Sequence, residues 1–259
     1  MGYGPPATAM MAGRTAKQHA SFLLPHLKPD MAVLDCGCGP GSVTIGLAEA
    51  VAPGHAVGTD VEESQLEIGR ASAGRNGVAN VRFEVASAYE LPFLDESFDA
   101  IFISAVMGNL REPLRGLSEA RRVLKPGGVI AVKEFDHGGD LLYPVTADLL
   151  EGVELYYRLR RHNGHDPDSG RKVPNHLNAA GFRDVTIRAT YETFSGPNVL
   201  PQFGNGFAAL VTEAFAEPLL QLGWVTSERM QGITRAWEEF PKQPGAFYAL
   251  AWCEALGWK

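Results

Sequence analysis

The sequence predicts an α/β fold with a doubly wound, mostly parallel sheet, and three observations support this. Short apolar runs alternate with helical patterns through the first half of the chain. The first run, at 32–34, leads into a glycine-rich turn at 35–41 and then a helical pattern at 42–51. The run at 100–104 is apolar on both faces, as a central parallel strand should be. Strand, turn and helix in this repeated order form βαβ units, whose strands are parallel.

Each further element of the first half follows from a local pattern. A helix is expected at 14–26, where apolar residues recur on one side and Pro25 limits its extension. Asn76-Gly77 is a helix stop signal, and the segment 125–128 (KPGG) is a turn. The remaining strands are expected at 56–60, 81–85, 100–104 and 129–134, and the helices between them at 62–76 and 114–124.

The second half is less regular. Helices are expected at 148–161 and 174–180, and alternation predicts a strand at 185–194. The aromatic-rich segment 195–245 contains several prolines and is mostly helical in pattern, so it is read as an insertion forming a cap. The predicted organisation is an N-terminal lid helix (1–30), the main α/β domain (31–194), a helical cap insertion (195–245) and a final strand of the main domain (246–259).

Composition narrows the function classes. The formal net charge of −7 and the pI of about 5.5 leave no basic footprint for a nucleic acid. The short run Arg158, Arg160 and Arg161 is typical of a solvated helix face. Three cysteines without metal-ligand spacing predict a reduced, metal-free protein. With no signal peptide and no membrane span in the sequence, we expect a cytoplasmic protein.

The turn at 35–41 (DCGCGPG) is the most informative segment. Its glycines allow a tight turn at a strand end and let backbone amides approach a ligand, beside the positive end of the next helix. Asp60 ends a strand about one βαβ step later, where a carboxylate binds ribose hydroxyls. These features predict a cofactor that contains adenosine.

Charge and spacing favour S-adenosylmethionine over a dinucleotide. The glycine spacing is G-x-G-x-G rather than G-x-G-x-x-G, and Asp35 opens the turn. Asp35 would repel a pyrophosphate, whereas it is compatible with a sulfonium cation. Two alternatives remain open: a non-catalytic nucleoside-binding protein and, less favoured, an NAD-dependent oxidoreductase.

These residues carry a resemblance to a known family. Six segments resemble, in order and spacing, the motifs of class I S-adenosylmethionine-dependent methyltransferases, in the branch of the ubiquinone and menaquinone methyltransferases. They are 33–41, 58–60, 91–93, 97–99, 122–128 and 180–182. The resemblance implies a Rossmann-like, seven-stranded sheet whose last strand, at 246–253, is antiparallel.

The resemblance also implies cofactor-binding roles. Gly37, Gly39 and Gly41 would line the methionine part near Asp35, and Asp60 would hold the ribose. The remaining implied contacts are Val61 on the adenine face, Ser87 and Ala88 at the adenine edge, and Ser104 and Ala105 near the amino group. Relatives usually have aspartate where Ser87 stands, so here the contact would come from an uncharged hydroxyl or from the Ala88 amide.

Candidates for catalysis and substrate binding are less defined. The histidine that relatives carry after the fourth strand is absent from 106–110. His137 is a candidate general base or a loop residue, and Asp136 and Glu134 are similar or lower candidates. Six aromatic residues are expected to form either the wall of a substrate pocket or the packed core of the cap: Tyr156, Tyr157, Phe203, Phe207, Phe215 and Trp224. The N-terminal segment is expected to form either a lid over the cofactor or a frayed terminus, and it contains Met10, Met11, Arg14 and His19. Cys36 and Cys38 are read as packing residues, and His162, His165 and His176 as surface or loop histidines.

The sequence therefore predicts methyl transfer to an oxygen, nitrogen or carbon nucleophile of a small, partly apolar metabolite. It leaves a homodimer open, and it identifies neither the acceptor nor a pathway.

Overall fold

The computed structural model describes residues 5–210 and 215–259. The chain folds into two compact units. One comprises Met1–Phe135, Ser169–Ala189 and Cys253–Lys259, and the other comprises Asp136–Asp168 and Thr190–Trp252. The predicted insertion at 195–245 falls within the second unit, together with the segment that follows the fifth strand.

Five parallel strands form the centre of the first unit. They are β1 (Ala32–Cys36), β2 (His55–Asp60), β3 (Val81–Val85), β4 (Phe98–Ser104) and β5 (Leu124–Phe135), in the order β3-β2-β1-β4-β5. The first four lie within two residues of their predicted positions. Strand β5 begins at Leu124 rather than 129, so the turn predicted at 125–128 is wrong and this segment belongs to the strand. Because β1 has β2 on one side and β4 on the other, the strand order reverses at β1. In open α/β sheets, ligands bind at the carboxyl ends of the strands at such a reversal.

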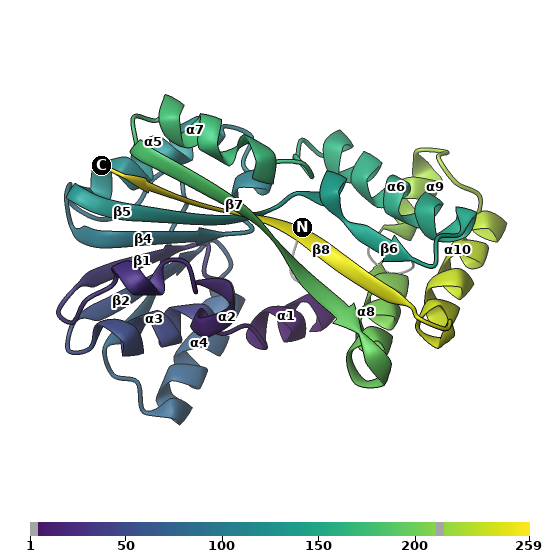
Figure 1. Cartoon of the computed structure of the whole chain (residues 1–259), viewed down its shortest axis with the longest axis horizontal. Helices are drawn as coiled ribbons and strands as arrows, with labels where there is room; N and C mark the ends of the chain where they lie inside the picture. Colours follow the sequence, from purple (N-terminus) through teal and green to yellow (C-terminus); the bar gives the residue numbers. More distant parts are fainter. Residues whose placement is uncertain (1–4, 211–214) are drawn as a thin grey trace. The chain divides into compact units, whose positions relative to one another are not determined.

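Apolar side chains cover both faces of this sheet, with alternate strand residues facing opposite sides. On one face, Val33 and Phe102 pack with α3 (Ser42–Val51) and α2 (Ala16–His19). On the other face, Leu34 and Ile103 pack with α5 (Pro113–Val123) and α7 (Val173–Ala179). Figure 1 shows α3 and α5 on opposite sides of the sheet. Helix α4 (Glu63–Asn76) packs Leu66 and Ala73 against Phe83.

Within the described residues the sheet contains eight strands, where seven were predicted. The order continues from β5 to β8 (Phe247–Trp258) and β6 (Leu141–Tyr143), and β7 (Arg183–Ser195) also pairs with β8. The unpredicted strand is β6, which pairs antiparallel with β8. It has three residues, between Gly139 and Pro144, and is too short for a period of two to be recognised.

The N-terminal helix predicted at 14–26 is wrong in extent. The chain forms α1 (Pro5–Ala12), the single turn of α2 and a 3₁₀ turn, η1 (Leu24–His26). The α-helix ends at His19, and Pro25, which lacks an amide hydrogen, lies in the first turn of η1. Residues 1–4 of the predicted lid lie outside the described residues, as do residues 211–214 of the predicted cap.

The second unit contains the expected helices. They are α6 (Ala147–His162), α8 (Gly196–Ala209), α9 (Ala216–Gln221) and α10 (Ser227–Glu239). Trp237 of α10 is fully buried and packs on Gly152 of α6, where an added Cβ would lie 2.7 Å from the indole nitrogen. A glycine at this position therefore allows the two helices to approach closely.

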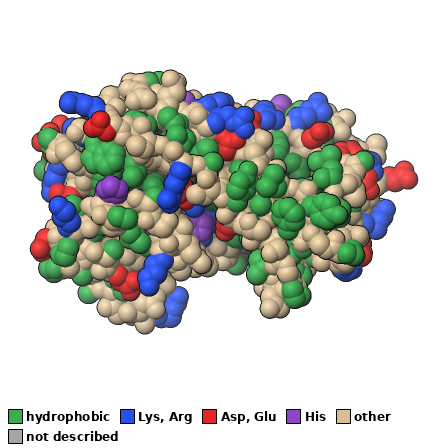
Figure 2. All heavy atoms as spheres, viewed as in Figure 1, with side chains coloured by type: hydrophobic (Ala, Val, Ile, Leu, Met, Phe, Trp, Pro, Cys, Tyr) green, Lys and Arg blue, Asp and Glu red, His purple; other side chains and the backbone are tan. Residues whose placement is uncertain are grey.

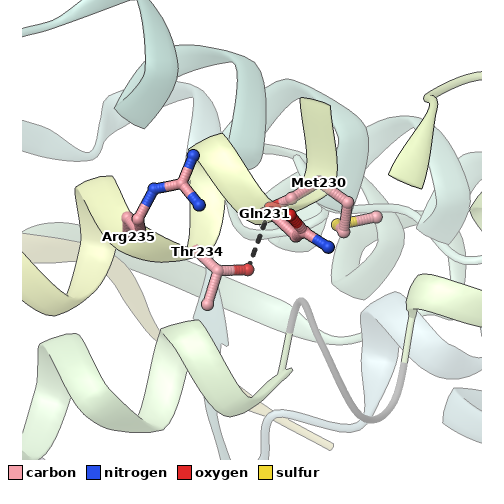
Figure 3. A pocket seen from close by; sticks show the side chains of 4 residues that line it. All are labelled: Met230, Gln231, Thr234 and Arg235. Atoms are coloured by element: carbon pink, nitrogen blue, oxygen red, sulfur yellow. Dashed lines mark hydrogen bonds between the residues drawn. The ribbon is translucent and has the colours of Figure 1, made fainter. Parts of the chain in front are cut away.

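A hollow of about 200 Å³ lies beside α10 and is lined by Met230, Gln231, Thr234 and Arg235 (Figure 3). The Thr234 hydroxyl donates to the Met230 carbonyl one turn earlier, at 2.9 Å. The lining includes none of the predicted substrate residues.

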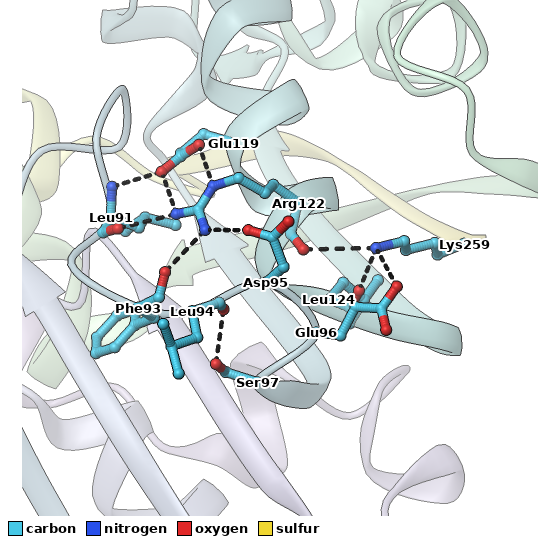
Figure 4. A network of polar contacts seen from close by, with 10 residues as sticks. All are labelled: Leu91, Phe93, Leu94, Asp95, Glu96, Ser97, Glu119, Arg122, Leu124 and Lys259. Atoms are coloured by element: carbon cyan, nitrogen blue, oxygen red, sulfur yellow. Dashed lines mark hydrogen bonds and ion pairs between the residues drawn. The ribbon is translucent and has the colours of Figure 1, made fainter.

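Arg122 of α5 holds the loop before β4 (Figure 4). Its guanidinium donates to the carbonyls of Leu91 and Phe93 at 3.0 and 2.8 Å and pairs with Glu119 and Asp95, each at 2.7 Å. One planar cation with several fixed donors therefore fixes the conformation of residues 91–95.

Two surface properties complete the description. Acidic and basic side chains are interspersed on the face shown in Figure 2. Within 5–210 and 215–259, no helix is long and apolar enough to cross a bilayer.

Candidate active site

The predicted glycine turn lies at the carboxyl end of β1 and leads directly into α3. The amides of Gly37 and Cys38 donate to the Thr59 carbonyl at 2.7 and 2.9 Å, which ties the turn to the end of β2. Gly37, Gly39 and Gly41 all have positive φ, of 81°, 52° and 72°. Only glycine adopts this region without strain, so the residue type follows from the backbone path.

Close packing requires glycine at both ends of the turn. A Cβ on Gly37 would lie 2.2 Å from Cγ2 of Val106, in the loop after β4. A Cβ on Gly41 would lie 2.3 Å from the buried Phe83 ring of β3. At Gly39 the nearest atom to an added Cβ is the Met11 sulfur, at 3.6 Å. The middle of the turn therefore lies beside the N-terminal segment, while its two ends pack against the loop after β4 and against β3.

Asp60 occupies the end of β2 beside this turn and is 4% exposed. Its Oδ2 accepts the Gly39 amide at 2.9 Å, and its Oδ1 accepts the Glu62 amide at 3.1 Å. Each carboxylate oxygen has a second lone pair, so both can also accept from a hydroxyl. Two backbone donors thus orient a carboxylate that can bind a diol.

Asp35 is buried at the end of β1, and its Oδ2 accepts the hydroxyl proton of Thr44 at 2.6 Å. Burial raises the pKa of Asp35 to about 7, Thr44 opposes the rise, and the negative charge of Asp60 adds to it. A nearby cation would favour the ionised form and lower this pKa. Asp35 therefore provides a carboxyl whose ionisation couples to a positively charged ligand.

The adjacent rim combines apolar and polar groups. Val61, directly after Asp60, is 64% exposed, and Val85, paired with Asp60 in the β2–β3 ladder, is 54% exposed. Ser87 Oγ accepts the Tyr89 amide at 3.2 Å, so the hydroxyl stabilises the local turn. Ala88 is half-buried beside it. Val85 was not predicted as a site residue; its exposed apolar side chain at a strand end becomes visible only in the structure.

The end of β4 brings Ser104 and Ala105 to the same edge of the sheet. The Ser104 hydroxyl oxygen is buried and has no hydrogen-bond partner among the described residues. Ala105 has a positive φ of 56°, and its amide donates to the Lys133 carbonyl at 2.9 Å. Glu134 accepts the Met107 amide at 2.7 Å and the Phe135 amide at 3.2 Å, so its carboxylate orients the loop after β4.

The predicted lid residues meet the site at Met11. The Met11 carbonyl accepts the Ser42 hydroxyl at 2.9 Å, which links α1 to the first residue of α3. Met10 is 43% exposed. The Arg14 guanidinium carbon lies 6.0 Å from the Phe135 ring centroid. His19 is buried, and burial, with Arg14 and Lys133, lowers its pKa to about 3, so the ring is neutral.

The two cysteines of the turn are reduced. Cys36 is buried and Cys38 half-buried, and burial raises the pKa of the Cys36 thiol to about 12. Both thiols are therefore protonated at neutral pH and pack as small apolar groups.

His137 begins a 3₁₀ turn in the second unit (η3, His137–Gly139) and is 9% exposed. Its Nδ1 lies 2.9 Å from Oδ2 of Asp140. The imidazole stacks on Tyr157, with ring centroids 4.9 Å apart, and meets the edge of Tyr156 at 6.0 Å. The structure thus brings together the predicted base and two predicted pocket tyrosines, and adds Asp140, which no sequence motif indicated.

Three of the four remaining predicted pocket aromatics, Phe203, Phe207 and Phe215, lie in one cluster of the second unit. Phe207 lies 6.0 Å from Tyr156 and 4.1 Å from Trp237, and Phe203 lies 4.6 Å from Tyr248. Phe215 also contacts Tyr156. Trp224 instead packs against His162 and Arg158, so it contributes to a different patch.

Comparison with known proteins identifies the family. The model of a family described as a methyltransferase domain matches residues 27–181, more than half of the chain. The chain belongs to this methyltransferase family. The match includes β1–β5, the glycine turn, Asp60 and Ser104. The prediction of a methyltransferase enzyme is confirmed, and the oxidoreductase alternative finds no support.

Two curated relatives and one solved structure illustrate the assignment. The methyltransferase is 29% identical to "probable methyltransferase ltbC" of Aspergillus luteorubrus, over 100% of this chain and 96% of that protein. It is 37% identical to a demethylmenaquinone methyltransferase of Clavibacter sepedonicus, over 60% of this chain and 67% of that protein. The crystal structure of Haemonchus contortus phosphoethanolamine N-methyltransferase 2 with S-adenosyl-L-methionine matches with a TM-score of 0.60 at 18% identity, over 94% of this chain and 52% of that chain. This last likeness supports the predicted Rossmann-like fold.

Proposed function

We propose that this methyltransferase transfers the methyl group of S-adenosylmethionine to an oxygen, nitrogen or carbon nucleophile of a small, partly apolar metabolite. S-adenosylmethionine supplies an electrophilic methyl group on a positively charged sulfur. One observation carries the proposal: Gly39 donates to Asp60, so the glycine turn and the diol-binding carboxylate form one preorganised edge. This arrangement suits a nucleoside without phosphates.

The groups at this edge fit the parts of that nucleoside. Asp60 would accept the ribose hydroxyls, and Val61, with Val85, offers apolar surface for the adenine. Ala88, rather than the engaged Ser87 hydroxyl, would meet the adenine edge. The unpartnered Ser104 oxygen and the neighbouring Ala105 would lie near the methionine amino group. Asp35 would supply negative charge toward the sulfonium end.

The second unit supplies the candidate groups for the acceptor. His137 would accept the proton that the nucleophile loses, and Tyr156, Tyr157, Phe203 and Phe207 would bind its apolar part. The segment 195–245 would act as the cap and residues 1–30 as the lid, with the Met11 contact as the point where the lid meets the glycine turn.

A methyl-transfer assay tests the proposal. The full chain is incubated with donor labelled in its methyl group and a panel of phenols, enols, amines and carbon acids. We expect label in at least one acceptor, together with S-adenosylhomocysteine, and its loss in Asp60→Asn. Tight donor binding without transfer to any acceptor would favour the non-catalytic alternative. Failure to bind the donor would overturn the proposal.

A further inference from the structure

A buried carboxylate in the second unit collects donors from distant parts of the sequence. Asp140, whose side chain is 6% exposed, accepts the hydroxyl protons of Tyr157 and Tyr248 at Oδ2, at 2.7 and 2.9 Å. Its Oδ1 accepts the Ala251 amide at 2.7 Å. His137 Nδ1 completes the set, 2.9 Å from Oδ2. The proposed function gives roles to His137 and Tyr157 but none to Asp140 or Tyr248.

The two phenols act as donors at neutral pH. Burial raises the pKa of both Tyr157 and Tyr248 above the usual tyrosine range, and the neighbouring Asp140 charge raises each further. Protonated phenols and a backbone amide leave Asp140 as the acceptor of the cluster. A lone pair on His137 Nδ1 would be repelled by the carboxylate oxygen 2.9 Å away, so Nδ1 points its proton at Asp140.

A hydrogen on Nδ1 makes Nε2 the proton-accepting nitrogen of a neutral imidazole. The Tyr157 ring, stacked at 26° to the imidazole, holds the ring plane. The His137 amide donates to the Pro167 carbonyl at 3.0 Å, which fixes the backbone of the same residue. These contacts of the second unit orient the tautomer, the ring plane and the backbone of His137.

We propose that Asp140 is a positioning residue that fixes the tautomer of His137 for proton removal from the methyl acceptor. This inference rests on the proposed function. The nucleophile's hydrogen passes to Nε2 as its freed electron pair forms the bond to the methyl carbon. The bond between that carbon and sulfur breaks, and its pair stays on the sulfur of S-adenosylhomocysteine. Asp140 stabilises the resulting imidazolium, which loses its proton to solvent.

Asp140→Asn is a sharp test because the Ala251 amide still requires an acceptor. The new side chain would keep its oxygen toward Ala251 and turn its NH₂ group toward His137. An NH₂ donor at Nδ1 moves the imidazole hydrogen to Nε2, which is the wrong tautomer for accepting a proton. Asp148→Asn, in an exposed pair with Arg229 of the same unit, is the matched control.

The first readout does not require activity. In full-length protein with ¹⁵N-labelled histidine, assigned by His137→Gln, we expect the Nδ1–H form of His137 in the wild type and in Asp148→Asn. We expect the Nε2–H form in Asp140→Asn. A wild-type protein that shows the Nε2–H form would overturn the inference, and this result needs no folded variant. An unchanged tautomer in a folded Asp140→Asn protein would also overturn it.

The second readout is the pH profile of kcat and KM with an accepted substrate. We expect kcat to fall at least ~100-fold in both His137→Gln and Asp140→Asn, in the range of general-base losses, with KM changed less than about threefold. The double variant should be no slower than His137→Gln. A kcat of His137→Gln equal to that of the wild type would overturn the inference but leave the proposed methyl transfer intact. No methyl transfer by the wild type would instead overturn the proposed function.

Discussion

The glycine edge of the first unit and the Asp140 cluster of the second are built in opposite ways. The first is formed by backbone: positive φ angles, amides that donate to Thr59 and Asp60, and strand ends that a parallel sheet brings together. The second is formed by side chains that come from β8, α6 and the turn at η3. A site made by local backbone geometry is readable as a motif, whereas a site made by long-range side-chain contacts is not.

The largest expected effect tests the backbone side of this comparison. Gly41→Ala should destabilise the protein by about 4 kcal/mol, because it adds left-handed strain to a clash with the Phe83 ring. Gly77→Ala is the control, since Gly77 has a similar φ of 68° but open space around an added Cβ. Its cost should be about 1 kcal/mol. Equal urea-unfolding free energies for the two variants would show that close packing does not dictate the turn.

The second prediction concerns Asp35 and sharpens the electrostatic part of the comparison. Its pKa is raised to about 7 from 3.8, so its neutral form is favoured in the folded protein, and stability falls as pH rises between these values. Asp35→Asn removes this loss. Without ligand, the unfolding free energy of the variant minus that of the wild type should rise by about 3 kcal/mol from pH 5 to pH 8. The variant should also bind the donor more weakly.

Urea unfolding at both pH values measures the first effect and calorimetry the second. The same change at Asp95, which is exposed and paired with Arg122, should show no comparable pH dependence. A pH-independent difference at Asp35 would contradict the account.

The smallest effect concerns packing in the second unit. Gly152→Ala should destabilise by about 2 kcal/mol, because its Cβ would approach the Trp237 indole nitrogen and Ile233 Cγ2 at 2.7 and 2.9 Å. Gly206→Ala, in α8 with open space around the new Cβ, should instead stabilise by about 0.5–1 kcal/mol, as alanine favours helix. The two changes measured by thermal unfolding should have opposite signs. A stabilising Gly152→Ala would mean that α6 and α10 tolerate wider separation.

These contrasts also explain what sequence could predict. The first five strands, α3 and the placement of Asp35 and Asp60 follow from hydrophobic periodicity and glycine chemistry within a few residues. Strand β6 could not be predicted because its three residues are too few to show a period of two. The helix predicted at 14–26 is shorter in the structure, where Pro25 belongs to a separate 3₁₀ turn. His137 was identified as a candidate from its place after a strand. Asp140 could not be, because its partners Tyr157 and Tyr248 are far away in the chain.

The cofactor roles of all the predicted site residues stay predictions, as does a homodimer. The structure places Gly39 in the turn beside Asp60, and Ser104 and Ala105 at the end of β4.

The central claim is that the edge from Asp35 to Asp60 binds a cationic nucleoside without phosphates. Isothermal titration of the full chain with S-adenosylmethionine, S-adenosylhomocysteine and NAD tests this directly, with Asp60→Asn beside the wild type. We predict binding of the first two ligands, no measurable binding of NAD, and a loss of roughly 10- to 100-fold in Asp60→Asn, because a charge-assisted hydrogen bond is removed. Tight NAD binding, or S-adenosylhomocysteine affinity unchanged in Asp60→Asn, would contradict the account.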